Sequence, residues 1–200
     1  TNSYAGRFFT RFAEKTSFLV EAREDRLDYR LASSQLDSKE RFYLVGVTWE
    51  ATAATSGIVK VGQIRKDFAS PTLRDFSGTG WDATVQWAPV SYSKFSFTTS
   101  KNFGESTGVG DFILTKRYGA TWLHEWNSRV SSAATISRAN DDFVNGARSD
   151  STDSIGLKLN YKVQRWLTIG GEYNNTNRDS SNSTFNYKKN LYSFTVGATL

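Results

Sequence analysis

The chain has 200 residues and a net charge of +5, and 38% of its residues are hydrophobic while 14% are aromatic. No run of 18 apolar residues is present, which excludes a transmembrane helix, and the high aromatic content argues against disorder. The absence of cysteine excludes a disulfide framework and a thiolate metal site.

Apolar and polar residues alternate along the chain, which is the pattern of strands with one apolar face. In "YAGRFFTRF", Tyr4, Phe8 and Phe12 oppose Arg7 and Arg11. The same period recurs in "YLVGVTWE", "GWDATVQWAP", "SIGLKLNYKV" and the C-terminal "YSFTVGATL". We predict eleven strands, over residues 3–12, 17–31, 39–53, 57–68, 79–90, 94–103, 110–127, 129–140, 152–163, 166–178 and 185–200.

Tight and long connections alternate between these strands. The tight ones are 13–16, 54–57, 91–93, 127–128 and 164–166, and the long ones are 32–38, 69–78, 102–110, 140–150 and 178–184. This schedule is typical of bacterial outer-membrane barrels, which have short periplasmic turns and longer extracellular loops. The sequence therefore predicts one all-β domain over 1–200, an antiparallel up-and-down transmembrane β-barrel with a periplasmic C-terminus.

Bacterial single-chain barrels have an even number of strands, so we expect these strands to be the C-terminal part of a barrel of about 12 or more. A soluble sandwich is the alternative. The two differ in side-chain direction. The barrel directs Leu157 and Leu159 toward lipid and Lys158, Asn160 and Lys162 inward, whereas the sandwich buries the leucines in a core.

Large aromatic residues flank the apolar stretches, as an aromatic girdle at the two membrane surfaces requires. The predicted girdle residues are Tyr43, Trp49, Trp81, Trp87, Tyr118, Trp122, Trp126, Tyr161, Tyr173 and Tyr192.

Charged residues fall on the opposite face of the predicted strands. The predicted lumen charges are Arg7, Arg11, Glu21, Arg23, Asp25, Glu50, Asp82, Glu125, Lys158, Lys162 and Glu172. They either fill the barrel with cross-strand ion pairs or form a basic path that attracts an acidic polymer. Three residues assigned to loops, Arg65, Lys66 and Arg74, would extend such a path to the mouth.

A catalytic or metal site is not favoured by the sequence. The single histidine, His124, shares a strand face with Trp122 and Trp126 and points away from Glu125. We interpret it as a girdle or turn-capping residue, with a lipid hydrolase or acyltransferase as the alternative. "NDDFVNGARSD" lacks the spacing of an EF-hand, so neither a metal nor a cofactor is predicted. Basic residues are scattered among strands, which argues against nucleic acid as a partner.

The stretch "VGQIRKDFASPTLRDFSGTGWDATVQWAPVSYSKFSFTTSKNFGES" is similar to part of a β-barrel porin family that includes EpsL-type proteins of exopolysaccharide operons. Further agreement lies in "WLHEWNSRV" and "YKVQRWLTIGGEY". The resemblance implies a non-catalytic outer-membrane pore or scaffold for exopolysaccharide export or surface attachment. A surface anchor whose loops bind a partner is the alternative.

The C-terminal strand raises a question of its own, because its alternation continues to the last residue. It resembles the signal that outer-membrane proteins present to the barrel-assembly machinery, with Leu200 in place of the usual Phe. The expected partners are therefore outer-membrane lipid, the assembly machinery and an anionic polysaccharide.

Overall fold

The computed structural model describes residues 1–30, 34–52, 54–106 and 108–199, and it is built from strands. The strands are β1 (Asn2–Ala13), β2 (Thr16–Leu27), β3 (Ser38–Thr52), β4 (Thr55–Phe68), β5 (Phe76–Val90), β6 (Ser93–Glu105), β7 (Phe112–Glu125), β8 (Val130–Val144), β9 (Ser149–Gln164), β10 (Leu167–Ser180) and β11 (Tyr187–Ala198). A single-turn 3-10 helix, η1 (Ser183–Phe185), lies between β10 and β11. Among the described residues, no helix is long and apolar enough to cross a membrane.

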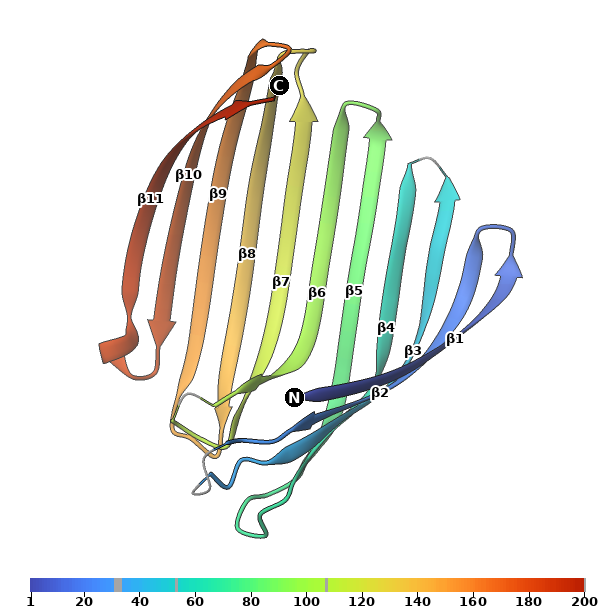
Figure 1. The fold of residues 1–200 in the computed structure, drawn as a ribbon, viewed down its shortest axis with the longest axis vertical. Coiled ribbons are helices and arrows are strands. Elements are labelled where there is room, and N and C mark those ends of the chain that lie inside the picture. Colours follow the sequence, from blue (N-terminus) through green and yellow to red (C-terminus); the bar gives the residue numbers. More distant parts are fainter. Residues whose placement is uncertain (31–33, 53, 107, 200) are drawn as a thin grey trace.

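All eleven strands belong to one sheet, and each pairs antiparallel with the next in chain order. Figure 1 shows this sheet as a curled wall, with connections gathered at two ends. We call these the tight-turn end, where β1 meets β2, and the long-loop end, where β2 meets β3. No pairing joins β1 to β11 in the described part of the chain. The predicted all-β, antiparallel, up-and-down architecture is confirmed.

The strict alternation of connection lengths is wrong at the β8–β9 hairpin. Cross-strand pairing continues to Asp142 and Ser149, so most of the predicted loop 140–150 is strand and only residues 145–148 connect. Asn145 takes a left-handed conformation (φ 57°), and the Gly146 N–H donates to the Phe143 carbonyl at 2.9 Å. Asn-Gly is a strong signal for a tight hairpin turn, and it accounts for the short connection.

Several strand ends also differ from prediction by one to four residues, and two of the differences have a visible cause. The strand predicted over 17–31 ends at Leu27, because the Tyr29 N–H donates to the Asp37 carboxylate at 2.7 Å instead of to a neighbouring strand. The last strand begins at Tyr187 because η1 precedes it. The predicted strand ends Leu31, Ala53 and Leu200 lie outside the described residues.

Alternation gives the sheet two chemically different faces. The inner face carries Glu21 and Lys60, and the outer face carries Val20 and Val61. On β9, Leu157 and Leu159 are 53% and 54% exposed on the outer face, and no second sheet covers them in the described residues. This is the arrangement of the barrel and not of the sandwich.

The buried apolar residues gather at the long-loop end. The core cluster consists of Phe42, Leu44, Ile64, Phe112 and Leu114. The first three lie on the inner face of β3 and β4, whereas Phe112 and Leu114 share a face of β7 with the exposed Tyr118. The cluster therefore joins the inner face of one part of the sheet to the outer face of another.

This contact is possible because β5 and β6 separate. Their pairing stops at Trp81 and Lys101, although β5 begins at Phe76 and β6 continues to Glu105. Figure 1 shows the lower parts of β6 and β7 bending away from β5. The Phe103 ring then packs edge-on against Phe76, with 5.8 Å between the ring centroids. We call residues 102–106 and 108–114 the tucked hairpin, since they cross the inner face of β3–β5.

Candidate functional site

A row of opposite charges crosses the inner face from β1 to β5. The Glu21 carboxylate lies 2.8 Å from the Arg7 guanidinium and 3.3 Å from the Lys60 ammonium. Lys60 also lies 3.3 Å from Asp82. Gly46 of β3 leaves room for this crossing, because a Cβ there would come within 2.9 Å of the Lys60 Cγ. We call this row the charge ladder.

Sequence reasoning named three members of the charge ladder and missed Lys60. The alternation of Val59, Lys60 and Val61 in "IVKVG" was the signal that could have found it, since it places Lys60 opposite two exposed valines. Lys60 is the residue that connects the carboxylates of β2 and β5.

Strand register places every predicted lumen charge on the inner face, but not all of them pair. Arg23 lies 3.1 Å from Asp25 and stacks over the Phe42 ring, and Lys158 lies 3.9 Å from Glu172. The other predicted charges make no ion pair within the described residues, and they lie near the tight-turn end: Arg11, Glu50, Glu125 and Lys162. That these side chains line an open lumen stays a prediction.

Lys66 is not a loop residue at the mouth, as the sequence suggested. It lies within β4, and its side chain is 1% exposed beneath the tucked hairpin. Its ammonium lies 2.6 Å from the Glu40 carboxylate and 3.5 Å from that of Glu105, which also accepts a hydrogen bond from the Tyr29 hydroxyl. Three aromatic rings lie close to this charge, with centroids 5.6 Å (Phe68), 5.9 Å (Phe103) and 5.8 Å (Phe112) from the ammonium. A buried ammonium needs such partners because burial removes its hydration.

Arg65 is not a loop residue either: it belongs to β4, on the outer face, as the predicted strand 57–68 also requires. Arg74 alone among the three lies in the β4–β5 connection.

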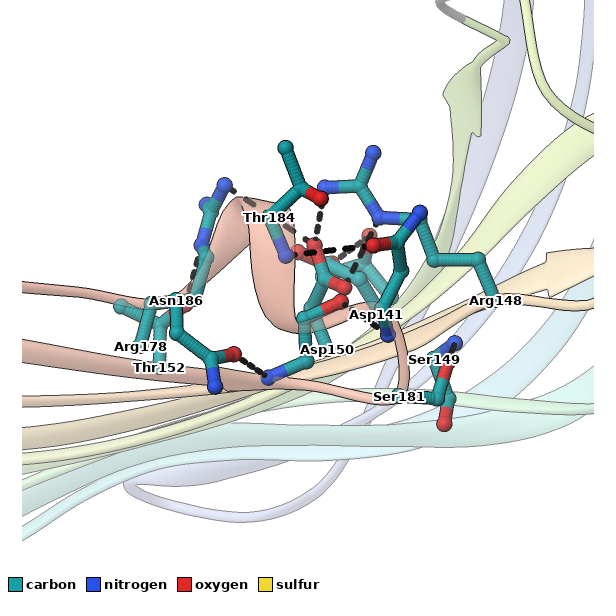
Figure 2. Close-up of polar contacts among 12 residues, drawn as sticks. Asp141, Arg148, Ser149, Asp150, Thr152, Arg178, Ser181, Thr184 and Asn186 are labelled. Atoms are coloured by element: carbon teal, nitrogen blue, oxygen red, sulfur yellow. Dashed lines mark hydrogen bonds and ion pairs between the residues drawn. The ribbon is translucent and has the colours of Figure 1, made fainter.

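A second buried charge lies at the long-loop end of β8–β10. The Asp150 side chain is almost fully buried and accepts hydrogen bonds from Arg148 at 2.9 and 2.5 Å, while Arg178 lies 3.8 Å away. Figure 2 shows both arginines directed toward Asp150 from opposite sides. The Arg148 guanidinium also covers the Phe185 ring at 3.5 Å, which fastens η1 to the β8–β9 hairpin. The hydrogen bond to Asp150 raises the pKa of Arg148, so this contact stays charged.

The predicted girdle residues lie on the outer face in two rows. Trp49 and Trp87 lie near the tight-turn end, and Tyr43 and Trp81 lie six residues along the same strands. At about 3.3 Å per residue the two rows are roughly 20 Å apart along a strand. Near the tight-turn end, the first row also includes Trp122, Trp126 and Tyr161. Further from that end, toward the long-loop end, lie Tyr118, Tyr173 and Tyr192. Their membrane role stays a prediction.

His124 lies in an aromatic group at the tight-turn end. Its ring centroid is 4.3 Å from that of Trp126 and 5.6 Å from that of Tyr92. Its buried Nδ1 has no hydrogen-bond partner among the described residues. These aromatic neighbours are what the girdle interpretation expects, and the role of His124 stays a prediction.

Comparisons with solved structures identify the fold. The chain is similar to the outer membrane channel DcaP of Acinetobacter baumannii, with a TM-score of 0.71 at 12% identity over 98% of this chain and 62% of that one. It is also similar to OmpT of Vibrio cholerae, with a TM-score of 0.51 at 13% identity over 97% and 62% of the two chains. The chain therefore spans less than two thirds of the length of either protein.

Sequence comparison assigns the family. No curated protein matches the chain significantly. The protein family described as "Putative beta-barrel porin 2" matches residues 2–200. The apolar outer face, the charged inner face and the strand order agree with such a barrel. The chain belongs to this family of outer-membrane β-barrel porins.

Proposed function

We propose that this chain forms part of the wall of a passive outer-membrane channel for an anionic polysaccharide. The observation that carries the proposal is the charge ladder on the inner face, opposite an outer face of exposed apolar residues. The charge ladder holds two cations and two carboxylates, so it gives the wall a charged, polar lining on a low-dielectric support, where electric fields are focused. The EpsL-type resemblance of residues 61–106 supplies the polysaccharide part of the proposal.

The inner face beyond the charge ladder also suits a water-filled conduit. Thr121 and Thr135 lie opposite each other on β7 and β8 with their hydroxyls 3.3 Å apart, and the row continues through Gly156 and Asn174. Small hydroxyl and amide groups leave space for water and exchange hydrogen bonds with sugar hydroxyls. Such a wall does no chemistry, which is why we propose a non-catalytic role.

The tucked hairpin is the proposed constriction. It crosses the inner face of β3–β5 at the long-loop end, where Phe103 and Phe112 meet Phe42 and Phe76. In the proposed orientation this end is extracellular, and the tight-turn end and the C-terminus are periplasmic.

Conductance of the full-length protein in planar bilayers tests the channel. We expect single-channel current steps in the wild type, and an increased preference for anions in the Asp82→Lys variant, because the charge ladder then loses a carboxylate and gains an ammonium. Asp153→Lys on the outer face is the matched control and should leave ion selectivity unchanged, because Asp153 pairs with Arg138 away from the inner face. Absence of current steps from correctly folded protein would refute the channel.

A surface anchor is the second candidate function, and contacts between two loops favour it. The Thr72 hydroxyl of the β4–β5 loop donates to the Gln35 side chain of the β2–β3 loop at 2.7 Å. Loops held in a fixed shape suit recognition of a partner. Shortening residues 69–75 should then abolish surface attachment while inner-face charge reversals leave it intact, whereas a pure channel predicts the opposite pattern.

Two partners complete the proposal. Outer-membrane lipid would cover the exposed apolar face, and the barrel-assembly machinery would bind the alternating C-terminal strand. Deletion of β11 should prevent insertion of the full-length barrel into assembly-competent proteoliposomes, whereas removal of residues 69–75 should not.

A further inference from the structure

Two pairs of like charges face each other across neighbouring strands of the outer face. Arg41 of β3 lies opposite Arg65 of β4, and Lys101 of β6 lies opposite Lys116 of β7. Like charges directly opposite one another destabilise a sheet. Each pair therefore needs a counter-charge that the facing residue does not supply.

Both pairs lie just beyond the row of aromatic residues nearer the long-loop end. Arg41 is two residues from Tyr43, and Lys116 is two residues from Tyr118, on the same strand faces. On the other side of these tyrosines the outer face is apolar, with Val45 more than half exposed. A change from apolar to charged residues at an aromatic row marks the surface of a bilayer. The pairs are thus placed at headgroup height.

Acidic side chains of the protein form ion pairs with only one member of each pair. Arg41 lies 2.9 Å from Glu24 and 2.5 Å from Asp67. Lys116 lies 3.5 Å from Asp142.

The other members of the two pairs are Arg65 and Lys101. Within the described residues neither of them makes an ion pair: Arg65 donates to the Gln63 side chain at 3.2 Å, and the Lys101 ammonium lies 5.7 Å from the Trp81 ring centroid. Arg65 is exposed and Lys101 is half-buried, so both can be reached from outside the sheet.

Like-charged pairs also occur on the inner face. Asp141 and Asp150 lie opposite each other, and Arg148 bonds to Asp150 within the fold. Asp25 and Glu40 also lie opposite each other, and Arg23 and Lys66 pair with them. Asp25 and Glu40 thus each have a counter-charge within the fold, whereas Asp141 accepts a hydrogen bond from the Thr115 hydroxyl and makes no ion pair in the described residues. Outside, one cation in each pair is left for an external anion.

We propose that Arg65 and Lys101, each beside a second cation, bind the phosphate groups of anionic lipids in the leaflet that surrounds the long-loop end. Arginine and lysine are the side chains that bind phosphate, and basic residues at a membrane surface attract anionic lipids. An apolar groove lies on the same face of the sheet, on the tight-turn side of Lys101 and Lys116. It is lined by Phe97, Tyr118 and Ile136, and it can hold an acyl chain. Headgroup and chain contacts together select a lipid over a free anion.

Native mass spectrometry of the full-length protein tests this binding. The protein is released from nanodiscs that contain equal amounts of phosphatidylglycerol and phosphatidylcholine, and the lipids retained are counted. We expect the wild type to retain phosphatidylglycerol preferentially. The Arg65→Gln/Lys101→Gln variant should lose this preference by about fivefold for each cation removed, from roughly 1 kcal/mol per basic residue near an anionic surface. Arg65→Lys/Lys101→Arg should keep it.

The matched control is Lys158→Gln/Lys162→Gln, which removes the same charge from the inner face and should not change lipid retention. An equal loss in this control would overturn the proposal, because it would reduce the effect to net charge. Equal retention of the two lipids by the wild type would also overturn it. Complete competition by inorganic phosphate would show an anion site without lipid selectivity, which contradicts it. Binding does not depend on conduction, so a barrel without current steps that still retains phosphatidylglycerol refutes only the proposed channel.

Discussion

The two halves of the sheet differ in how well they shield charged residues on the inner face from water. In β2–β5 the inner face is packed: Glu21, Ile64 and Lys66 are almost completely buried, and the tucked hairpin covers the long-loop end. In β9–β11 the inner face away from the long-loop end is open, and the Lys158–Glu172 pair stays substantially exposed. The Lys66–Glu40 ion pair is shielded from water, and the Lys158–Glu172 pair is not. The two ion pairs should therefore contribute unequally to the free energy of unfolding.

The largest expected effect comes from removing the buried cation of the packed half. Lys66→Ala leaves Glu40 and Glu105 without their ammonium inside an aromatic cluster, and we expect the free energy of unfolding to fall by roughly 3–5 kcal/mol. Urea unfolding of the full-length barrel in lipid vesicles measures this loss. The Lys66→Met/Glu40→Gln/Glu105→Gln variant removes all three charges and should recover much of it. A loss under about 1 kcal/mol for Lys66→Ala would contradict the burial of this charge.

A lipid-facing substitution in the open half should have the next largest effect. Leu157→Arg places a guanidinium on the outer face between the aromatic rows, at an expected cost of roughly 2–4 kcal/mol near the bilayer midplane. Asn160→Arg, on the same strand but on the inner face, is the control and should be close to neutral. The same unfolding assay compares the two. Equal costs would mean that the two faces of β9 meet the same solvent.

The packed half also depends on Gly46, where no larger residue fits between the neighbouring strands. A Cβ at Gly46 would lie 2.3 Å from the Val59 carbonyl oxygen and 2.9 Å from the Lys60 Cγ. Gly46→Ala should therefore destabilise the barrel by about 1–3 kcal/mol, because the strand or Lys60 must shift. Gly171→Ala in the open half, where a Cβ meets nothing within 4 Å, should change the unfolding free energy very little.

The smallest effect is expected at the exposed ion pair of the open half. Lys158→Gln removes an interaction across 3.9 Å between two solvated side chains, so we expect a loss of roughly 0–1 kcal/mol that disappears at high salt. Unfolding at low and high ionic strength measures it. A loss as large as that of Lys66→Ala would show that the open half is shielded from water after all.

The sequence by itself determined the faces of the strands. Leu157 and Lys158 alternate because a strand directs neighbouring side chains to opposite sides, and a slip by one residue would place lysine in lipid. The same local rule placed the predicted lumen charges and girdle residues on their faces. The short β8–β9 connection was also readable, since Asn145-Gly146 encodes the turn, but the surrounding polar residues suggested a loop.

Only the tertiary structure decided which charges are buried and which elements cover them. Lys66 has the same local pattern as an exposed strand lysine, and its burial comes from Glu105 and Phe112, about forty residues further along the chain. The outer-face position of Phe103 likewise predicts contact with lipid, yet the ring lies against Phe42 because β5 and β6 separate. Alternation is a property of a single strand, whereas separation of two strands and packing of one face on another depend on residues that are distant in sequence.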